Sequence, residues 1–102
     1  MVSDVISKPI AQVLTKMTHE PRLDVAVTLA VKEWLQLRLG LAETKRSRYE
    51  QKYGMDFAAF KSAWNDDKIP AKYSYEVETD YLEWEGAITD SEDIREMAVL
   101  LP

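Results

Sequence analysis

The chain has 102 residues, 46% of them hydrophobic, and it contains no cysteine. This length and composition are typical of one globular domain, and the absence of cysteine excludes disulfides and zinc–thiolate sites and fits the cytoplasm. We expect neither a signal peptide nor a membrane span, because no apolar stretch approaches the roughly 20 residues that a membrane-spanning helix needs.

Charge is divided unevenly along the chain, whose net charge is −5. Residues 1–64 contain 10 lysines and arginines against 7 acidic residues, a net +3, whereas residues 65–102 contain 3 against 11, a net −8. An acidic C-terminal part disfavours nucleic acid as its partner and favours a basic protein surface. Charge runs also occur simply as solvated helix faces, and that interpretation stays open here.

The N-terminal segment, residues 1–21, is predicted to contain one short amphipathic helix over about residues 8–18. Ser7 is a suitable N-cap, and Pro9 lies in the first turn, where its missing N–H does no harm. The apolar residues at helical spacing are Ile10, Val13, Leu14 and Met17.

A long helix over residues 22–53 is the next predicted element. A boundary at Pro21 precedes it, and Thr18 or Glu20 could provide its N-cap. The apolar residues in its first two thirds alternate, which is typical of a strand, but they also fit one helical face and no turn residue divides them into a hairpin. Good helix formers dominate its second half, so we favour the helix and keep the strand as the alternative.

One short chain offers few elements to cover such a helix. It would extend over roughly 48 Å, whereas a compact domain of this size has a radius of gyration of about 13 Å. Its first half is apolar on almost every side and therefore needs packing partners on several sides. We expect a homodimer with these residues at the dimer interface: Val27, Val31, Trp34, Leu35, Leu37 and Leu41.

A sharp turn is predicted where the long helix ends. Gly54 suits the left-handed conformation that ends a helix, and Asp56 suits the N-cap of the short aromatic helix expected over residues 56–65. The aromatic stripe of this helix consists of Phe57, Phe60 and Trp64. The stripe would fold back onto Tyr49 and Tyr53. The residues assigned to the structural turn are Tyr53, Gly54, Met55, Phe57 and Phe60.

After a polar linker, an acidic helix or pair of helices is predicted over residues 74–100. Ser74 is a suitable N-cap. The apolar positions at helical spacing are Val77, Tyr81, Trp84 and Ile88. Thr89 and Glu92 match a capping box, so a second helix could begin there.

Together these elements predict one all-α domain over residues 1–102. Each predicted helix has an apolar face that another helix must cover. We therefore expect a helical hairpin or bundle with one long central helix, completed by dimerisation.

The residue types needed for catalysis or metal binding do not converge in this sequence. Glu76, Asp80 and Glu83 lie on one helical face, but a metal site in a helical bundle usually adds histidine. The one histidine, His19, lies at a predicted helix boundary. Nucleophilic catalysis has no cysteine or second histidine to use. We therefore predict no enzymatic activity, no catalytic residue, no metal and no cofactor.

Binding to another protein is the function that remains. The segment YSYEVETDYLEWEG, residues 73–86, interleaves acidic and aromatic residues. Aromatic anchors supply interface energy and carboxylates supply steering. The predicted partner-binding residues are Tyr75, Glu76, Glu78, Asp80, Tyr81, Glu83, Trp84 and Glu85. The alternative is a nucleic-acid-binding regulator that uses the N-terminal helix and the basic segment KRSR, residues 45–48.

Two segments resemble a family of small bacterial and archaeal proteins: YEQKYGMDFAAFKSAW, residues 49–64, and IPAKYSYEVETDYLEWEGAI, residues 69–88. The family pattern is Y/F-E-x-K-Y-G-M-x-F-x-x-F followed by D-Y-x-E-W-E. The matching residues are Tyr49, Lys52, Tyr53, Gly54, Met55, Phe57, Phe60, Tyr81, Trp84 and Glu85. The resemblance covers about residues 22–90 and implies the antitoxin-side partner of a toxin, often of the TumE type, encoded nearby in a two-gene toxin–antitoxin locus. It assigns catalysis to none of these residues.

Overall fold

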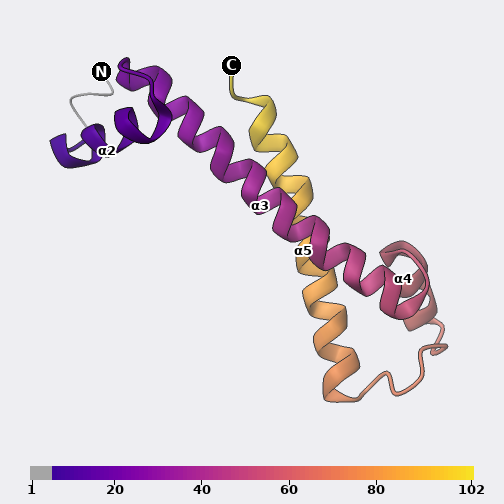
Figure 1. Ribbon diagram of the computed structural model, residues 1–102. Helices are drawn as coiled ribbons and strands as arrows, with labels where there is room; N and C mark the ends of the chain where they lie inside the picture. Colours follow the sequence, from indigo (N-terminus) through magenta and orange to yellow (C-terminus); the bar gives the residue numbers. More distant parts are fainter. Residues whose placement is uncertain (1–5) are drawn as a thin grey trace.

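A computed structural model describes residues 6–102 of the chain (Figure 1). The described part contains helices and no strand, so the all-α prediction is confirmed and the strand alternative for the long central segment is wrong. The helices, in chain order, are α2 (Lys8–Thr18), α3 (Leu23–Tyr53), α4 (Phe57–Asn65) and α5 (Tyr75–Val99). Residues 1–5 of the predicted N-terminal segment lie outside the described range.

The chain is extended. Its principal extents are 56 × 24 × 21 Å and its Cα radius of gyration is 19.4 Å, well above the value of about 13 Å for a compact domain of this length. The 31 residues of α3 run along most of the long dimension (Figure 1). The single chain is thus an open, extended set of helices, and a hairpin or bundle completed by dimerisation stays a prediction.

The main packing contact in the chain is made where α5 crosses α3 in the antiparallel direction (Figure 1). The buried residues of α5 recur at alternating spacings of four and three, and they are Asp80, Trp84, Ala87, Ser91 and Ile94. The face of α3 that includes Leu35, Ala42 and Tyr49, spaced seven apart, is buried as well. Small residues occupy the middle of both stripes, which lets the two backbones approach closely.

Local signals explain where the C-terminal helices begin and end. Gly54 ends α3 with φ 70°, in the left-handed region, and its N–H donates to the carbonyl of Glu50 at 2.8 Å. The Asp56 carboxylate then caps α4 by accepting the Ala59 N–H at 2.8 Å. The Ser74 hydroxyl caps α5 in the same way. The chain reverses between α3 and α4 because these two caps lie only two residues apart.

The suggested caps of α3 are wrong, and the structure decides between one helix and two over residues 74–100. Neither Thr18 nor Glu20 caps α3, because the Thr18 hydroxyl donates to its own helix and the Glu20 carboxylate accepts the N–H and guanidinium of Arg22. Arg22 is the N-cap residue, with no side-chain cap. α5 is one continuous helix through Thr89. Its buried stripe continues on both sides of that residue, so packing on α3 overrides the capping-box signal.

Candidate functional site

An aromatic cluster joins α3, α4 and α5 at one end of the molecule. Trp84 and Phe60 are fully buried, with ring centroids 5.0 Å apart. Tyr53 lies 4.7 Å from the Phe60 ring, and Phe57 lies 5.4 Å from the Trp84 ring. Tyr81 packs against the same cluster. Of the predicted partner-binding residues, Trp84 therefore belongs to the interior of the chain and Tyr81 is half-buried at its edge, because α4 folds back over this face of α5.

A polar network lies directly beside the aromatic cluster. The Asp80 side chain is buried and accepts hydrogen bonds from Lys52 Nζ at 2.5 Å and from the Tyr53 hydroxyl at 2.6 Å. Lys52 also donates to Glu76 at 2.8 Å, so its ammonium bridges two turns of α5. The Tyr49 hydroxyl donates to Glu83. Glu76, Asp80 and Glu83, which we predicted to face a partner, thus hold α5 against α3.

The network changes the ionisation of its members. Burial raises the pKa of Tyr53 to about 12, and the hydrogen bond to Asp80 adds to this increase. Burial also raises the pKa of Tyr49, with the hydrogen bond to Glu83 as the second cause. Hydrogen bonds to Asp80 and then to Glu76 raise the pKa of Lys52. At neutral pH both phenols are therefore protonated donors, and Lys52 is a cation paired with carboxylates.

The outward face of α5 carries what we call the acidic strip, which consists of Tyr75, Glu78, Leu82, Glu85, Thr89, Glu92 and Glu96. These residues are spaced three and four apart and lie two positions from the buried stripe, which places them on the opposite side of the helix. Tyr75 is 85% exposed and Leu82 is 66% exposed. Among residues 6–102, the four glutamates of the strip form no ion pair. Trp64 and Tyr81 line a hollow beside Glu78 and Leu82.

Of this strip, only Tyr75, Glu78 and Glu85 are among the residues predicted to bind a partner. Leu82 is not among the residues predicted to bind a partner, and Glu92 is assigned to a capping box. The sequence feature that identifies the outward face of α5 is an alternating spacing of three and four residues. It runs two positions out of step with Trp84 and the other buried residues of α5. The predicted partner-binding residues therefore come from both faces of α5.

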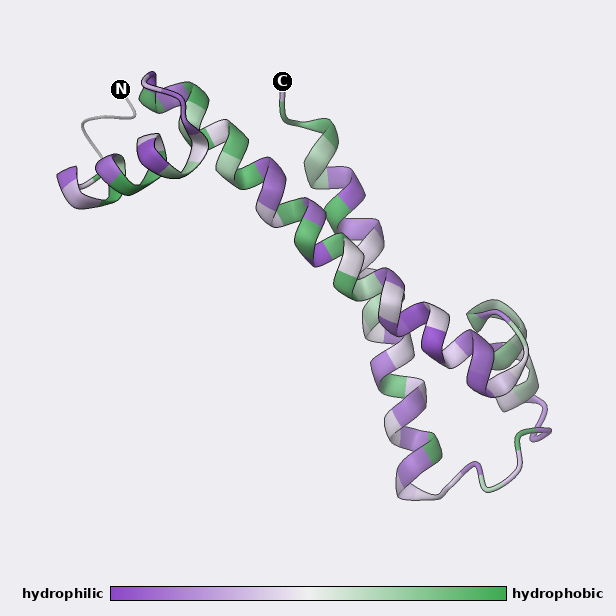
Figure 2. Cartoon of the chain, viewed as in Figure 1, coloured by the Kyte–Doolittle hydropathy of each residue, from purple (hydrophilic) through white to green (hydrophobic). Residues whose placement is uncertain are grey.

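A second exposed surface lies on α3. We call it the α3 seam, and it consists of Leu23, Val27, Ala30, Trp34, Leu37 and Leu41. Trp34, Leu37 and Leu41 are each more than half exposed, and the other three residues are half-buried near α2. Figure 2 shows apolar residues along the first half of α3 and on α2. Ile10, Val13 and Met17 of α2 are exposed as well.

Most of the predicted dimer-interface residues lie on or beside this seam. Val27, Trp34, Leu37 and Leu41 belong to it, and Val31 is exposed at its edge. Leu35 differs, because it is only 6% exposed and borders Ile94 of α5 in the groove between the two helices. Leu35 therefore stabilises the single chain and is not part of the free surface.

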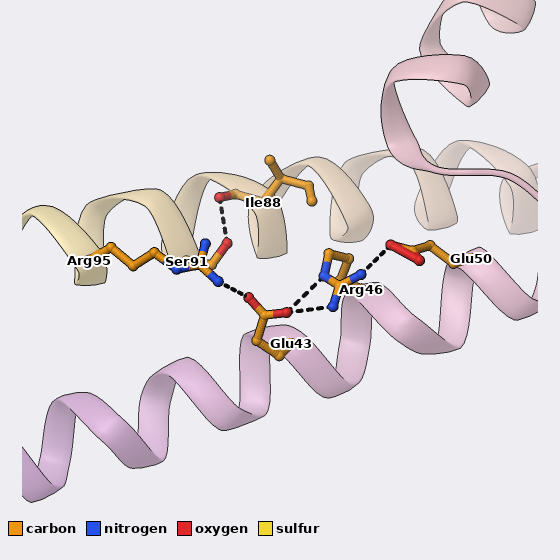
Figure 3. Close-up of polar contacts among 6 residues, drawn as sticks. All are labelled: Glu43, Arg46, Glu50, Ile88, Ser91 and Arg95. Carbon is orange, nitrogen blue, oxygen red and sulfur yellow. Dashed lines mark hydrogen bonds and ion pairs between the residues drawn. The ribbon is translucent and has the colours of Figure 1, made fainter.

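The basic segment KRSR is partly neutralised within α3. Arg46 forms ion pairs with Glu43 and Glu50, one turn away on either side, and Arg95 of α5 also binds Glu43 (Figure 3). The Arg48 guanidinium lies over the Tyr49 ring. Lys45 and Arg48 then line a groove between α3 and α5 together with Arg38, Leu41 and Asp90. The cationic surface offered by the segment is therefore small.

Searches for a metal site, a membrane-spanning helix and similar proteins gave the following results. Within residues 6–102, no group of three or more histidine, cysteine, aspartate or glutamate residues could hold a metal ion. No helix in the same range is long and apolar enough to cross a membrane. No family model, curated protein or solved structure matches the chain. The acidic strip and the α3 seam are the two exposed surfaces of the described chain that point to a function.

Proposed function

We propose that the protein is a non-enzymatic, antitoxin-like binding module whose acidic strip covers a basic surface on a cognate toxin protein. The observation that carries this proposal is the set of four glutamates on the outward face of α5 that form no ion pair within residues 6–102. Two large exposed side chains, Tyr75 and Leu82, lie among them. Carboxylates steer a basic partner into place, and the aromatic and aliphatic side chains supply binding energy.

The rigid support behind the strip favours the same function. Trp84 is fully buried on the opposite side of α5, and Lys52 holds Glu76 and Asp80 from α3. A surface that is already ordered loses less conformational entropy on binding. The hollow beside Glu78 and Leu82 could accept a protruding apolar side chain of the toxin.

A homodimer formed through the α3 seam is the second part of the proposal. Exposed apolar patches of this kind on monomeric proteins usually mark interaction sites. The seam lies on α3, whereas the acidic strip lies on the side of α5 that points away from α3. Self-association therefore leaves the strip free for the toxin.

The proposal is tested by co-expressing the protein with the product of the neighbouring reading frame and measuring co-purification and affinity. We expect a complex that weakens as salt increases, because exposed charges are screened. Glu78→Lys should weaken binding tenfold or more, since like charges facing each other cost several kcal/mol and about 1.4 kcal/mol is tenfold. Asp66→Lys, an exposed residue outside the strip, makes the same change in charge and serves as the control.

Two results would contradict the proposal. One is a wild-type protein that does not bind the neighbouring gene product at low salt. The other is equal weakening by Glu78→Lys and Asp66→Lys, which would mean that net charge matters and the strip does not. The nucleic-acid alternative relies on Lys45 and Arg48, and salt-dependent retardation of the protein's own promoter DNA would detect it.

A further inference from the structure

The residues of the α3 seam follow the spacing of a coiled coil. From Leu23 to Leu41 the intervals are four, three, four, three and four residues, and a coiled-coil seam has this alternation. The seam is one position out of step with the Leu35 stripe that faces α5, so it lies about 100° around the helix from that stripe. A helix can therefore pack along the exposed part of the seam, from Trp34 to Leu41, while α5 stays in place. From Leu23 to Ala30 the seam is half-buried where α2 packs on α3, so a second helix shares that part with α2.

We infer that two copies of this chain pair antiparallel along the α3 seam, with Ala30 of each copy packed against Leu41 of the other. This inference rests on the homodimer of the proposed function and defines its geometry. The seam is about 27 Å long at 1.5 Å per residue. It continues to Thr44 and Arg48 at the same spacing, where its character changes from apolar to polar.

Side-chain volumes favour the antiparallel arrangement. If Ala30 packs against Leu41, the same register places Trp34 against Leu37, so each of these two layers combines a larger side chain with a smaller one. A parallel pair would instead place each residue against its own copy. Two Trp34 side chains would overfill one layer, and two Ala30 side chains would leave the next layer underfilled.

Charges beside the seam favour the same arrangement. Asp24 and Lys45 lie on the same flank at opposite ends of the seam, because Asp24 directly follows Leu23 and Lys45 lies one turn beyond Leu41. Antiparallel pairing brings Asp24 of one copy next to Lys45 of the other. Parallel pairing would place Arg48 against Arg48 of the second copy, and like charges across an interface are unfavourable.

Disulfide trapping tests this geometry directly, because the chain contains no cysteine of its own. Ala30→Cys and Leu41→Cys are made as separate variants, one with a size tag, and are oxidised mildly alone and after mixing. We expect a covalent dimer in the mixture that contains one chain of each variant, and no covalent dimer from either variant alone. In the antiparallel pair the two copies of residue 30 are separated by about 16 Å along the axis, beyond the Cα separation of roughly 7 Å that a disulfide can span.

The alternative outcomes separate the geometry from the homodimer. Covalent dimers from each variant alone, with none specific to the mixture, would overturn the antiparallel inference and leave the homodimer standing. Monomeric wild-type protein at all concentrations, with no covalent dimer in the mixture, would overturn both. Toxin binding through the acidic strip is measured on the same preparations, so its loss or retention is scored independently.

A charge exchange provides a second test that does not depend on disulfide geometry. Asp24→Lys and Lys45→Asp should each weaken dimerisation by up to about fivefold, because an exposed ion pair makes a small contribution. The double variant, which restores opposite charges between copies, should recover most of the affinity. Failure of the double variant to recover any affinity would contradict the antiparallel register.

Discussion

The two ends of the molecule differ in how completely one chain covers its apolar side chains. At the aromatic end, α4 and the first half of α5 enclose Trp84 and Phe60, which are fully buried. At the open end, α2 and the first half of α3 leave Trp34 57% exposed, and α5 ends with Val99 and Leu100 in solvent. One chain therefore buries the core of the aromatic end, whereas apolar side chains at the open end stay exposed.

One helix, α3, serves both ends, and its two halves show why they differ. In its second half, Tyr49 and Tyr53 supply two inward rings and Lys52 supplies one ammonium, and most of the remaining residues are polar. In its first half, apolar residues occupy two faces, one toward α5 and the other forming the α3 seam. A helix with two apolar faces needs two partners. Within residues 6–102, α5 covers the face that contains Leu35, and no helix covers the seam from Trp34 to Leu41.

The largest difference between the ends should appear on truncating a tryptophan. Trp84→Ala removes a fully buried ring and should lower the free energy of unfolding by about 3–5 kcal/mol. Trp34→Ala removes an exposed ring and should change the stability of dilute protein by no more than about 0.5 kcal/mol. Urea denaturation at low protein concentration measures both.

Trp84→Phe refines this measurement. The Trp84 Nε1–H is buried without a hydrogen-bond partner among residues 6–102, so phenylalanine should be tolerated better than alanine. Equal destabilisation by Trp84→Ala and Trp34→Ala in dilute protein would mean that the two ends are equally covered and that the comparison is wrong.

The turn that closes the aromatic end should be the next most sensitive position. Gly54 has φ 70°, and a β-branched residue there should cost about 1–3 kcal/mol of stability. Gly86 provides the matched control, because it lies within α5 and a methyl group at this position meets no atom within 4 Å. Gly86→Ala should stabilise the protein by about 0.5–1 kcal/mol. A melting temperature unchanged by Gly54→Val would contradict the structure of the turn.

Alkaline pH should loosen the aromatic end before it affects the rest of α3. Tyr53 has its pKa raised to about 12 from a usual value of 10.0, and the pKa values of Tyr49 and Lys52 are raised as well. Unfolded protein therefore loses these protons first, so stability is fully present below pH 10 and falls as the pH rises toward 12. Phenolate absorbance and circular dichroism, followed together, should show late tyrosine ionisation that coincides with unfolding. Tyr53→Phe should reduce this dependence.

The smallest effect is expected at the ion pairs near the middle of the molecule. Glu43 accepts hydrogen bonds from both Arg46 and Arg95, which links α3 to α5 (Figure 3). Glu43→Gln should lower stability by less than about 1 kcal/mol, because partly exposed ion pairs contribute little. Thermal denaturation at low and high salt would measure it. A loss as large as that of Trp84→Ala would mean that charge, and not aromatic packing, holds α5 in place.

The sequence predicts the helices better than it predicts their faces. The termination at Gly54, the cap at Asp56 and the length of α3 depend on local conformational preferences, which the sequence carries directly. Whether Trp84 or Leu82 points inward depends on where α4 and α3 pack, and these are contacts between distant segments. Leu35 illustrates the same limit, because it is as apolar as Leu37 but faces α5.

The direct test of the account is the mass of the protein in solution as a function of concentration, measured by sedimentation for the wild type and for Leu37→Glu. A surface that needs a second copy predicts a reversible wild-type dimer, and Leu37→Glu should be a monomer with unchanged helix content because Leu37 is exposed in the single chain. A wild-type protein that stays monomeric at high concentration, or a Leu37→Glu variant that still forms the dimer, would contradict the account.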